Sequence, residues 1–384
     1  MKMRRVAVVG IGQSKFGELW EKSFRDIVIE AGIEALEDAN ISGEEIEAIY
    51  VGNMSGGRYL AQEHIGALIA DYSGLAELGI PSVRVEAADA SGGVAFREAY
   101  LAVASGLYDI VIAAGAEKVT DVGAELAVDI MSSSADREWE YFVGATLPAL
   151  YALIARVHMK EFGTKEEDMA LVSVKNHKNA VKNPKAQFRR EITVEDVLRS
   201  PYIAEPIKVL DSAPISDGAA VVILASEEIA KKLTDTPVYV SAVTQASDYL
   251  SLQSRKDLTS FRAAKMAAKK AYKLAKIEAK DVDVAEVHDS FTIAEIIAYE
   301  DLGFCEKGEG AKMIREGETE VGGRIPVNVS GGLKACGHAT GATGVRQIVD
   351  LVRILRDGIA DAETGLALNL GGTGATAVVS ILRR

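Results

Sequence analysis

Apolar residues recur along the chain at two spacings, which together predict alternating strands and helices. Between residues 24 and 39 they fall every three to four positions, which is typical of a helix with one buried face. Short apolar runs such as 6–9 and 110–114 end at glycine or polar residues and are typical of buried strands. This alternation predicts an α/β fold with largely buried sheets.

The same pattern occurs twice, which predicts two similar halves that pack together. Residues 24–51 and 261–287 each have the pattern of an amphipathic helix, an acidic turn and a short strand. An apolar run precedes each of them, at 6–9 and at 238–243. Each half continues with two further apolar runs, which lie at 83–86 and 109–115 in the first half and at 326–328 and 365–372 in the second.

A long, mainly helical stretch separates the two halves. Its clearest predicted helices cover 151–162 and 165–181, and a strand-like run follows at 219–224. Because long structureless loops are uncommon in compact domains, we expect a cap domain here. The expected segments are residues 1–119 as the first part of the N-terminal half, 120–212 as the helical cap, 213–236 as the return to that half, and 237–384 as the C-terminal half.

Composition and charge narrow the class of protein. The chain has 384 residues, 48% of them hydrophobic, and its 43 basic and 56 acidic residues give a formal net charge of -13. Such acidity disfavours sequence-independent binding to nucleic acid or to an anionic membrane. No run reaches the ~18 apolar residues of a membrane span. The apolar run at 6–12 lacks a cleavage site, so we expect a cytoplasmic protein with neither nucleic-acid nor membrane partners.

The residues typical of metal or dinucleotide sites are sparse. Cys305 and Cys336 are too few for a disulfide framework or a four-cysteine zinc site, and the histidines show no familiar zinc spacing. Gly10 and Gly12 follow the first predicted strand, but the third glycine of a dinucleotide fingerprint is missing. We therefore expect no metal, no NAD and no tightly bound cofactor.

Two of the five histidines follow a predicted strand end or a glycine-rich turn in the second half. His288 lies in the sequence HDSF, and His338 lies in GHATGATG. Open α/β sheets bind ligands at such positions, so both are candidate site residues. His64, His158 and His177 lie in helical patterns beside charged residues and have the pattern of ordinary surface or cap histidines.

Basic residues gather in the cap segment of this acidic chain. They are Lys175, Lys178, Lys182, Lys185, Arg189 and Arg190. A solvated helix face and a site for a phosphate-rich ligand both fit this spacing.

Five ordered motifs resemble those of the thiolase superfamily, in its archaeal and sterol-carrier-protein-x type subgroup of acetyl-CoA acetyltransferases. The motifs are EAADASGG at 86–93, SDGAA at 216–220, HDSF at 288–291, GHATGATG at 337–344 and NLGGTG at 369–374. The resemblance covers essentially the whole chain. It implies the thiolase fold, in which two βαβαβαββ halves form a five-layered α-β-α-β-α arrangement with a helical loop or cap domain.

The resemblance also implies a C-acyltransferase of acetyl-CoA and acetoacetyl-CoA, linked to the mevalonate route, with acyl-CoA as the substrate. Family members acylate a cysteine at the start of a buried helix, where the helix N-terminus stabilises a thiolate. By position, His338 would activate that nucleophile and help hold the thioester oxygen, and His288 would complete this first oxyanion hole. The N–H groups of residue 89 and Gly371 would form a second. The implied CoA-binding residues are Ser216, Gly332 and Lys334.

The match with the family breaks at the nucleophile, where Asp89 stands in place of cysteine. Two further thiol positions of the family hold Ser290, at an acid/base position, and Asn369, and Ala339 replaces a usual proline. A carboxylate is a poor nucleophile toward a thioester, so we expect condensation and thiolysis to be impaired or altered. Cys336, next to the glycine of the histidine motif, is a candidate rescuing thiol.

Three explanations of Asp89 stay open. It is an engineered substitution, or the chain is a repurposed acyl-CoA-binding paralogue that carries out decarboxylation or hydrolysis with Asp89 as a base, or it is a catalytically silent subunit of a complex. The resemblance further implies a homodimer or dimer of dimers. It also implies a complex with a hydroxymethylglutaryl-CoA synthase and a small zinc-ribbon, OB-fold partner.

Overall fold

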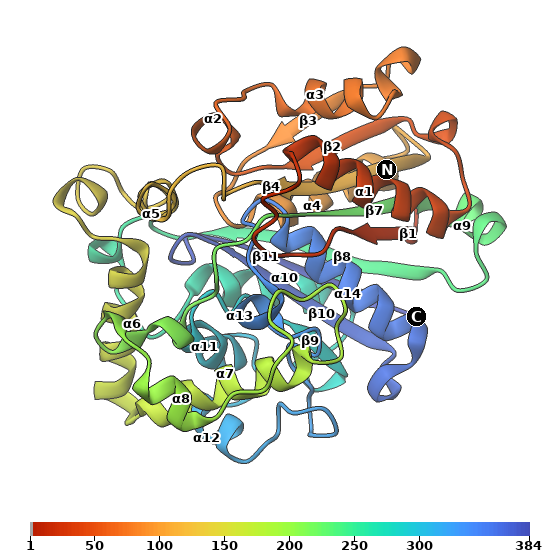
Figure 1. Ribbon diagram of the computed structural model, residues 1–384. Helices are drawn as coiled ribbons and strands as arrows, with labels where there is room; N and C mark the ends of the chain where they lie inside the picture. The colour runs from red at the N-terminus through yellow and green to blue at the C-terminus, as the bar shows by residue number, and fades with distance from the viewer. Residues whose placement is uncertain (1–2) are drawn as a thin grey trace.

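The computed structural model describes residues 3–384 (Figure 1). Its strands are β1 (Val6–Gln13), β2 (Ala48–Gly52), β3 (Ser82–Val85), β4 (Ile110–Glu117), β5 (Tyr202–Ala204), β6 (Ile207–Lys208), β7 (Gly218–Ser226), β8 (Val238–Ser247), β9 (Val284–Glu286), β10 (Thr364–Gly371) and β11 (Thr376–Arg383). Its α-helices are α1 (Phe24–Ala39), α2 (Gly56–Tyr59), α3 (Ile65–Tyr72), α4 (Ser91–Ser105), α5 (Ala124–Ser132), α6 (Leu147–Phe162), α7 (Glu166–Ala180), α8 (Val194–Arg199), α9 (Glu227–Leu233), α10 (Arg262–Ala275), α11 (Thr292–Asp301), α12 (Gly310–Arg315), α13 (Gly332–Cys336) and α14 (Thr343–Asp357).

The strand order repeats between the two halves, as the repeated sequence pattern predicts. The nine-stranded sheet has the order β3-β2-β4-β7-β1-β8-β11-β10-β9. In the first half, β3, β2 and β4 are parallel, and β7 and β1 follow antiparallel. In the second half, β9 and β10 are parallel, and β11 and β8 follow antiparallel. A single parallel bridge between Ala285 and Val327 takes the place of a fifth strand, so the apolar run at 326–328 forms only this bridge.

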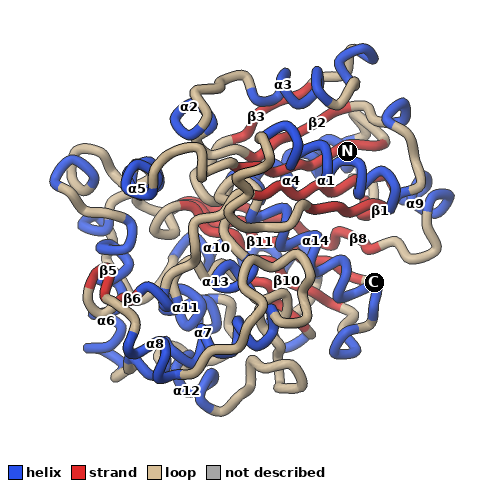
Figure 2. Tube along the Cα trace, viewed as in Figure 1, coloured by secondary structure: helices blue, strands red, loops and turns tan. Residues whose placement is uncertain are grey.

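Two helices lie between the two halves of the sheet. Strands β1 and β8 pair at two positions, Ala7 with Tyr239 and Val8 with Val238. This short pairing is where the sheet of the first half meets the sheet of the second. Helix α14 contacts β7, β4 and β1 of the first half as well as β10 and β9 of the second, and α4 likewise contacts strands of both halves. Helices α1 and α3 pack on the outer face of the first half and α10 packs on that of the second, which gives the five α-β-α-β-α layers that the resemblance implies. Figure 2 shows α3 beside β3 at the edge of the first half.

The outer helices show why these sequences form buried layers. Helix α1 starts at a Ser23 capping box with Asp26 and buries Ile27 and Ala31 from its apolar face. Helix α10 instead buries alanines, which let its backbone lie close to β8 and β11. The alanines are Ala263, Ala264, Ala267, Ala268, Ala271 and Ala275.

The starts of α4 and α14 meet backbone to backbone because glycines face one another there. A Cβ on Gly344 would lie 2.1 Å from the Gly93 nitrogen, and one on Gly92 would lie 2.7 Å from the Gly341 oxygen. No side chain fits at these distances. The glycine-rich motifs of the two halves are therefore held against each other at the centre of the molecule.

The mainly helical segment lies between β4 and β7 in the chain. Its longest helices, α6 and α7, match the helices predicted at 151–162 and 165–181, and α7 packs on α11, α12 and α13 of the second half. Within residues 3–384, no helix combines the length and the apolar character that crossing a membrane requires.

The glycine contact gives a stability prediction. We expect Gly344→Ala to lower the free energy of unfolding by about 3 kcal/mol, since the new methyl group overlaps the Gly93 backbone. Gly32→Ala, in α1, is the matched control, because no atom lies within 4 Å of its added Cβ. Its better helix propensity predicts a gain of roughly 0.5–1 kcal/mol. Urea unfolding of both variants measures the difference, and equal effects would contradict the close approach.

Candidate active site

Asp89 lies in the turn between β3 and α4, directly before the N-terminus of that helix. Its side chain is buried, and the preceding Ala88 adopts a positive φ of 51°. One carboxyl oxygen, Oδ1, lies 3.1 Å from Nε2 of His338, and Oδ2 accepts the N–H of Gly372 at 2.8 Å. The helix N-terminus and the N–H group both favour a negative charge here.

The hydrogen bonds around His338 define where its protons lie. The Thr343 hydroxyl donates to the Ala339 carbonyl, so its oxygen accepts from Nδ1 of His338 at 2.7 Å. Nε2 is left to face Asp89. Burial raises the pKa of Asp89, but the hydrogen bond to His338, the charge of His338 and the Gly372 N–H lower it by more, so the net shift is downward. The carboxyl is therefore ionised, and Nε2 holds the proton between them.

Asn369 joins three segments of the site through one amide group. Its Oδ1 accepts the N–H of Gly93 at 3.1 Å, and its Nδ2 donates to the Asp89 carbonyl at 3.0 Å. Nδ2 also lies 3.1 Å from Nδ1 of His288. Because Nδ2 is a donor, Nδ1 of His288 is the acceptor, and its proton is on Nε2.

His288 therefore offers a free N–H group beside the Asp89–His338 pair. Its ring lies perpendicular to that of His338, with centroids 5.2 Å apart. Nε2 is buried and has no hydrogen-bond partner among residues 3–384. Burial and the neighbouring positive charge of His338 lower the pKa of His288 to about 3, so the ring stays neutral. A neutral imidazole N–H can donate to a ligand oxygen.

Buried polar groups from the first half hold the loop that carries His338. The Ser216 hydroxyl accepts the main-chain N–H of His338 at 2.9 Å. The Glu117 carboxyl accepts from the Thr340 hydroxyl and from the Gly341 N–H, both at 3.1 Å, and also from the Met54 N–H. Burial raises the pKa of Glu117 to about 7.

A second polar cluster holds the turn that carries His288. The Asp289 carboxyl accepts the main-chain N–H groups of Leu333 and Lys334, at 2.6 and 3.1 Å, and so fixes the start of α13. Asn176, on the cap helix α7, donates to Asp289 and to Glu295, both at 2.7 Å. The site is thus tied to the cap through buried hydrogen bonds.

The three predicted CoA-binding residues lie within this framework. Ser216 contacts the main chain of His338, and Gly332 packs so closely on Asp289 that a Cβ would lie 2.4 Å from its carboxyl oxygen. Burial lowers the pKa of Lys334 to about 8, although the negative charges of Asp289 and Asp211 act to raise it. Their contact with CoA stays a prediction.

Tyr151 is a site residue that sequence reasoning missed. Its hydroxyl donates to the Gly372 carbonyl at 3.0 Å, and its ring stacks on Phe291 at 4.4 Å between centroids. Ser290 is buried beside it, and its carbonyl accepts the N–H of Ala213. Nothing in the pattern of helix α6 separates this tyrosine from an ordinary core residue.

Gly371 and Gly372 have different contacts. Gly371 closes the pairing of β10 with β11, and a Cβ there would lie 2.5 Å from the Ala87 carbonyl. The N–H that meets the Asp89 carboxyl belongs to Gly372. The oxyanion role predicted for Gly371 therefore stays a prediction.

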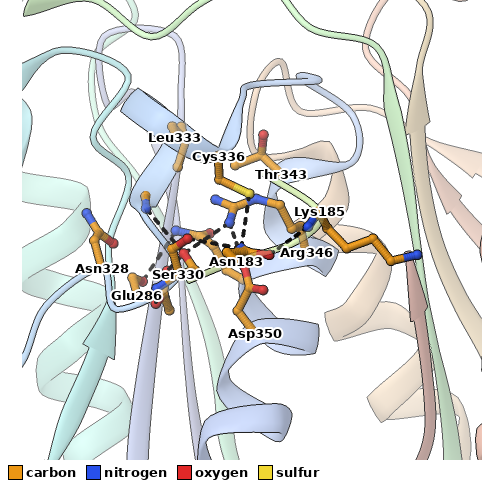
Figure 3. A network of polar contacts seen from close by, with 12 residues as sticks. Asn183, Lys185, Glu286, Asn328, Ser330, Leu333, Cys336, Thr343, Arg346 and Asp350 are labelled. Atoms are coloured by element: carbon orange, nitrogen blue, oxygen red, sulfur yellow. Dashed lines mark hydrogen bonds and ion pairs between the residues drawn. The ribbon is translucent and has the colours of Figure 1, made fainter. Parts of the chain in front are cut away.

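Cys336 lies in a buried polar network with Asn183, Ser330 and Arg346 (Figure 3). Its sulfur accepts a weak hydrogen bond from the Asn183 amide at 3.6 Å. The Arg346 guanidinium in the same network donates to Ser330 and Asp350, at 3.2 and 2.5 Å. Burial raises the pKa of the Cys336 thiol to about 12, which disfavours the thiolate that a rescuing nucleophile needs.

The structure changes the interpretation of several other charged residues. The sequence pattern allowed a surface or a cap position for His158 and His177, and the structure buries both. Each makes a hydrogen bond inside the cap, His158 to Thr164 and His177 to the Arg190 carbonyl. Lys175 is buried in an ion pair with Glu295, so the predicted basic cluster is not one solvated face. Ion pairs with acidic groups of other elements also join Lys178 to Glu320 and Lys185 to Glu34. Within residues 3–384, no three His, Cys, Asp or Glu side chains gather in a metal-binding arrangement.

Comparison with known protein families and proteins gives consistent matches. Models of the thiolase N-terminal domain and the thiolase C-terminal domain-like family match residues 6–228 and 244–384. The acetyl-CoA acetyltransferase of Methanothermobacter thermautotrophicus is 52% identical over 100% of both chains. That of Methanocaldococcus jannaschii is 49% identical over 99% of both. Sterol carrier protein 2 of Gallus gallus is 35% identical and covers 98% of this chain, which spans 71% of that protein.

Solved structures resemble the chain over its whole length. The Ltp2-ChsH2(DUF35) aldolase matches with a TM-score of 0.87 and 27% identity, over 100% of this chain and 98% of that chain. Human mitochondrial 3-ketoacyl-CoA thiolase in complex with CoA matches with a TM-score of 0.76 and 20% identity, over 100% and 98%. At that identity the second likeness concerns the fold alone.

The buried carboxyl of Glu117 predicts a pH dependence of stability. Its pKa of about 7 in the folded state exceeds its ordinary value of 4.5, so its contribution is full at low pH and is lost as pH rises through 7. Between pH 5 and 8, we expect the free energy of unfolding to fall by roughly 2.5 kcal/mol more for the unchanged protein than for Glu117→Gln. Denaturant titrations across this range measure both slopes.

The matched control is Glu125→Gln, at an exposed position of α5. We expect this variant to keep the slope of the unchanged protein. If the Glu117→Gln curve runs parallel to both, the buried carboxyl does not titrate in this range.

Proposed function

The chain belongs to the thiolase family of acyltransferases, and on this premise we propose that it binds short-chain acyl-CoA thioesters at the Asp89–His338 pair and stabilises an enolate there. The main support for this proposal is the unpaired Nε2–H of His288, which lies beside the hydrogen-bonded Asp89 and His338 side chains. Such an N–H group stabilises a thioester oxygen as the oxygen gains negative charge. The relatives named acetyl-CoA acetyltransferases, at 52% and 49% identity, support acetyl-CoA and acetoacetyl-CoA as the substrate class.

We further propose that acyl transfer through residue 89 is strongly impaired. Asp89 occupies the position at the start of α4 where the family has its acylated cysteine. Its carboxylate is paired with His338 and Gly372, which stabilises the charge and lowers its nucleophilicity. Attack on a thioester would also give a mixed anhydride that water hydrolyses. Cys336 offers no replacement, because its thiol is buried in the Arg346 network and has a pKa of about 12.

A second subunit is part of the proposal. The aldolase at 27% identity forms a complex with a DUF35 partner, which supports a small partner protein for this chain as well. The implied homodimer or dimer of dimers, and the hydroxymethylglutaryl-CoA synthase partner, rest on the family resemblance and remain proposals, as does a role in the mevalonate route.

The nucleophile position can be tested by restoring its thiol. We expect Asp89→Cys to raise CoA-dependent cleavage of acetoacetyl-CoA by on the order of 10²-fold or more, because His338 and the N-terminus of α4 would stabilise a thiolate. The loss of absorbance of the acetoacetyl-CoA enolate measures the rate. Ser290→Cys is the matched control, since it adds a buried thiol without replacing Asp89, and we expect it to restore nothing.

Two outcomes contradict the proposal in different ways. Appreciable thiolysis by the unchanged protein would show that Asp89 does not impair acyl transfer. No gain in Asp89→Cys, together with no binding of CoA to either form in calorimetry, would remove the acyl-CoA assignment itself.

A further inference from the structure

One buried polar group beside the Asp89–His338 pair lacks a hydrogen-bond partner among residues 3–384. It is Nε2 of His288, whose ring centroid lies 5.2 Å from that of His338. Its other ring nitrogen, Nδ1, accepts from the Asn369 amide, so Nε2 carries the proton and is a donor. An unpaired buried polar group costs free energy unless a ligand satisfies it. An acceptor oxygen of a bound molecule at this position would satisfy the N–H group of His288.

The Asp89–His338 pair is a base and an acid in one unit. The carboxylate can accept a proton, and Nε2 of His338 can donate one. Their atoms are 3.1 Å apart, so a proton accepted by Asp89 can pass to a deprotonated His338 and restore the starting state. The pair can therefore complete a cycle that takes one proton from a substrate and returns one to it.

The side chains of Asp89, His338 and His288 suit a reaction that breaks a carbon–carbon bond without forming an acyl-enzyme. We propose that the Asp89–His338 pair cleaves 3-hydroxyacyl-CoA thioesters by a retro-aldol reaction, which yields acetyl-CoA and an aldehyde or ketone. This inference rests on the proposed function, because it uses the same acyl-CoA site and the same enolate, and it names the substrate class of that site.

The reaction balances without a further reactant. The Asp89 carboxylate takes the proton of the C3 hydroxyl, the C3–O bond becomes a carbonyl, and the C2–C3 bond breaks. Its electron pair moves to C2 and the thioester oxygen, which accepts a hydrogen bond from Nε2–H of His288. The enolate then takes the Nε2 proton of His338 at C2 and becomes acetyl-CoA. The proton on Asp89 finally passes to His338, and the ion pair is restored.

Other reactions of acyl-CoA thioesters use these groups less well. Acyl transfer needs a nucleophile stronger than a paired carboxylate. Decarboxylation of a malonyl-type substrate would place a second carboxylate beside ionised Asp89 in a buried site, where like charges repel strongly. Hydrolysis would need a water molecule at Asp89 and leaves the acid function of His338 without a carbon to protonate.

The test uses the intact protein with 3-hydroxybutyryl-CoA and 3-hydroxy-3-methylbutyryl-CoA. We expect acetyl-CoA with acetaldehyde from the first and acetyl-CoA with acetone from the second, measured by mass spectrometry and by hydrazone formation. The second substrate is a tertiary alcohol, so no contaminating dehydrogenase can oxidise it to a thiolase substrate. In D₂O, the acetyl-CoA formed should carry one deuterium at C2, which distinguishes protonation of an enolate from hydrolysis.

Three variants assign the reaction to Asp89. Asp89→Asn keeps the size of the side chain but removes the base, and we expect a loss of about 100-fold or more. Asp89→Cys should lose the retro-aldol reaction while it gains thiolysis, so a folded variant gives opposite changes in two assays. Cys305→Ser, whose thiol lies outside the site and whose side chain is only half-buried, should leave the cleavage rate unchanged.

Each contrary outcome identifies what fails. If the protein binds acetyl-CoA but releases no aldehyde or ketone from either substrate, the retro-aldol proposal is overturned and the acyl-CoA site stands. Release of CoA with the intact hydroxy acid would also overturn it, in favour of hydrolysis. Full activity in Asp89→Asn would remove Asp89 as the base. If acyl-CoA does not bind at all, the underlying proposed function fails.

Discussion

The close approach of two glycine-rich helix starts is the constraint on which the rest of the structure depends. Gly92 and Gly93 on α4 lie against Gly341 and Gly344 near α14, at distances that exclude any side chain. This contact joins the two sequence repeats at the ends that carry Asp89 and His338. Asp89 comes from the first repeat and His338 from the second, so their hydrogen bond exists only because the two backbones meet.

Buried carboxyl groups hold the loops of the site at some cost in solvation. Glu117 binds the loop after His338, Asp289 binds the start of α13, and Glu286 accepts from Ser330 within the network around Arg346. Burial raises the pKa of all three. Each carboxyl gathers several donors, which for Glu117 and Glu286 come from loops and for Asp289 come from helices α7 and α13. Such clusters fix irregular loops more precisely than apolar packing can.

Sequence periodicity predicts the fold well here, because the pattern is local and occurs twice. The repeat, the strand-like runs and the long helices α1, α6, α7 and α10 follow from spacing, and the motif histidines follow from their place after strand ends. The five-layered arrangement follows from the family resemblance. The remaining features depend on tertiary contacts. The run at 326–328 has strand character, yet forms only the bridge from Val327 to Ala285. The contact of Tyr151 with Gly372, and the choice of Gly372 over Gly371 as the donor to Asp89, depend on positions that no spacing encodes.

Asn369 has a consequence for how such sites can change during evolution. Its single amide serves Gly93 and Asp89 at the start of α4, and also His288, which lies far from them in the sequence. A cysteine at this position would leave an amide N–H, a carbonyl and a ring nitrogen without their partner. That single exchange would therefore destabilise the site, because three buried polar groups lose their partner at once. A thiol can enter this position only together with exchanges that satisfy those groups in another way.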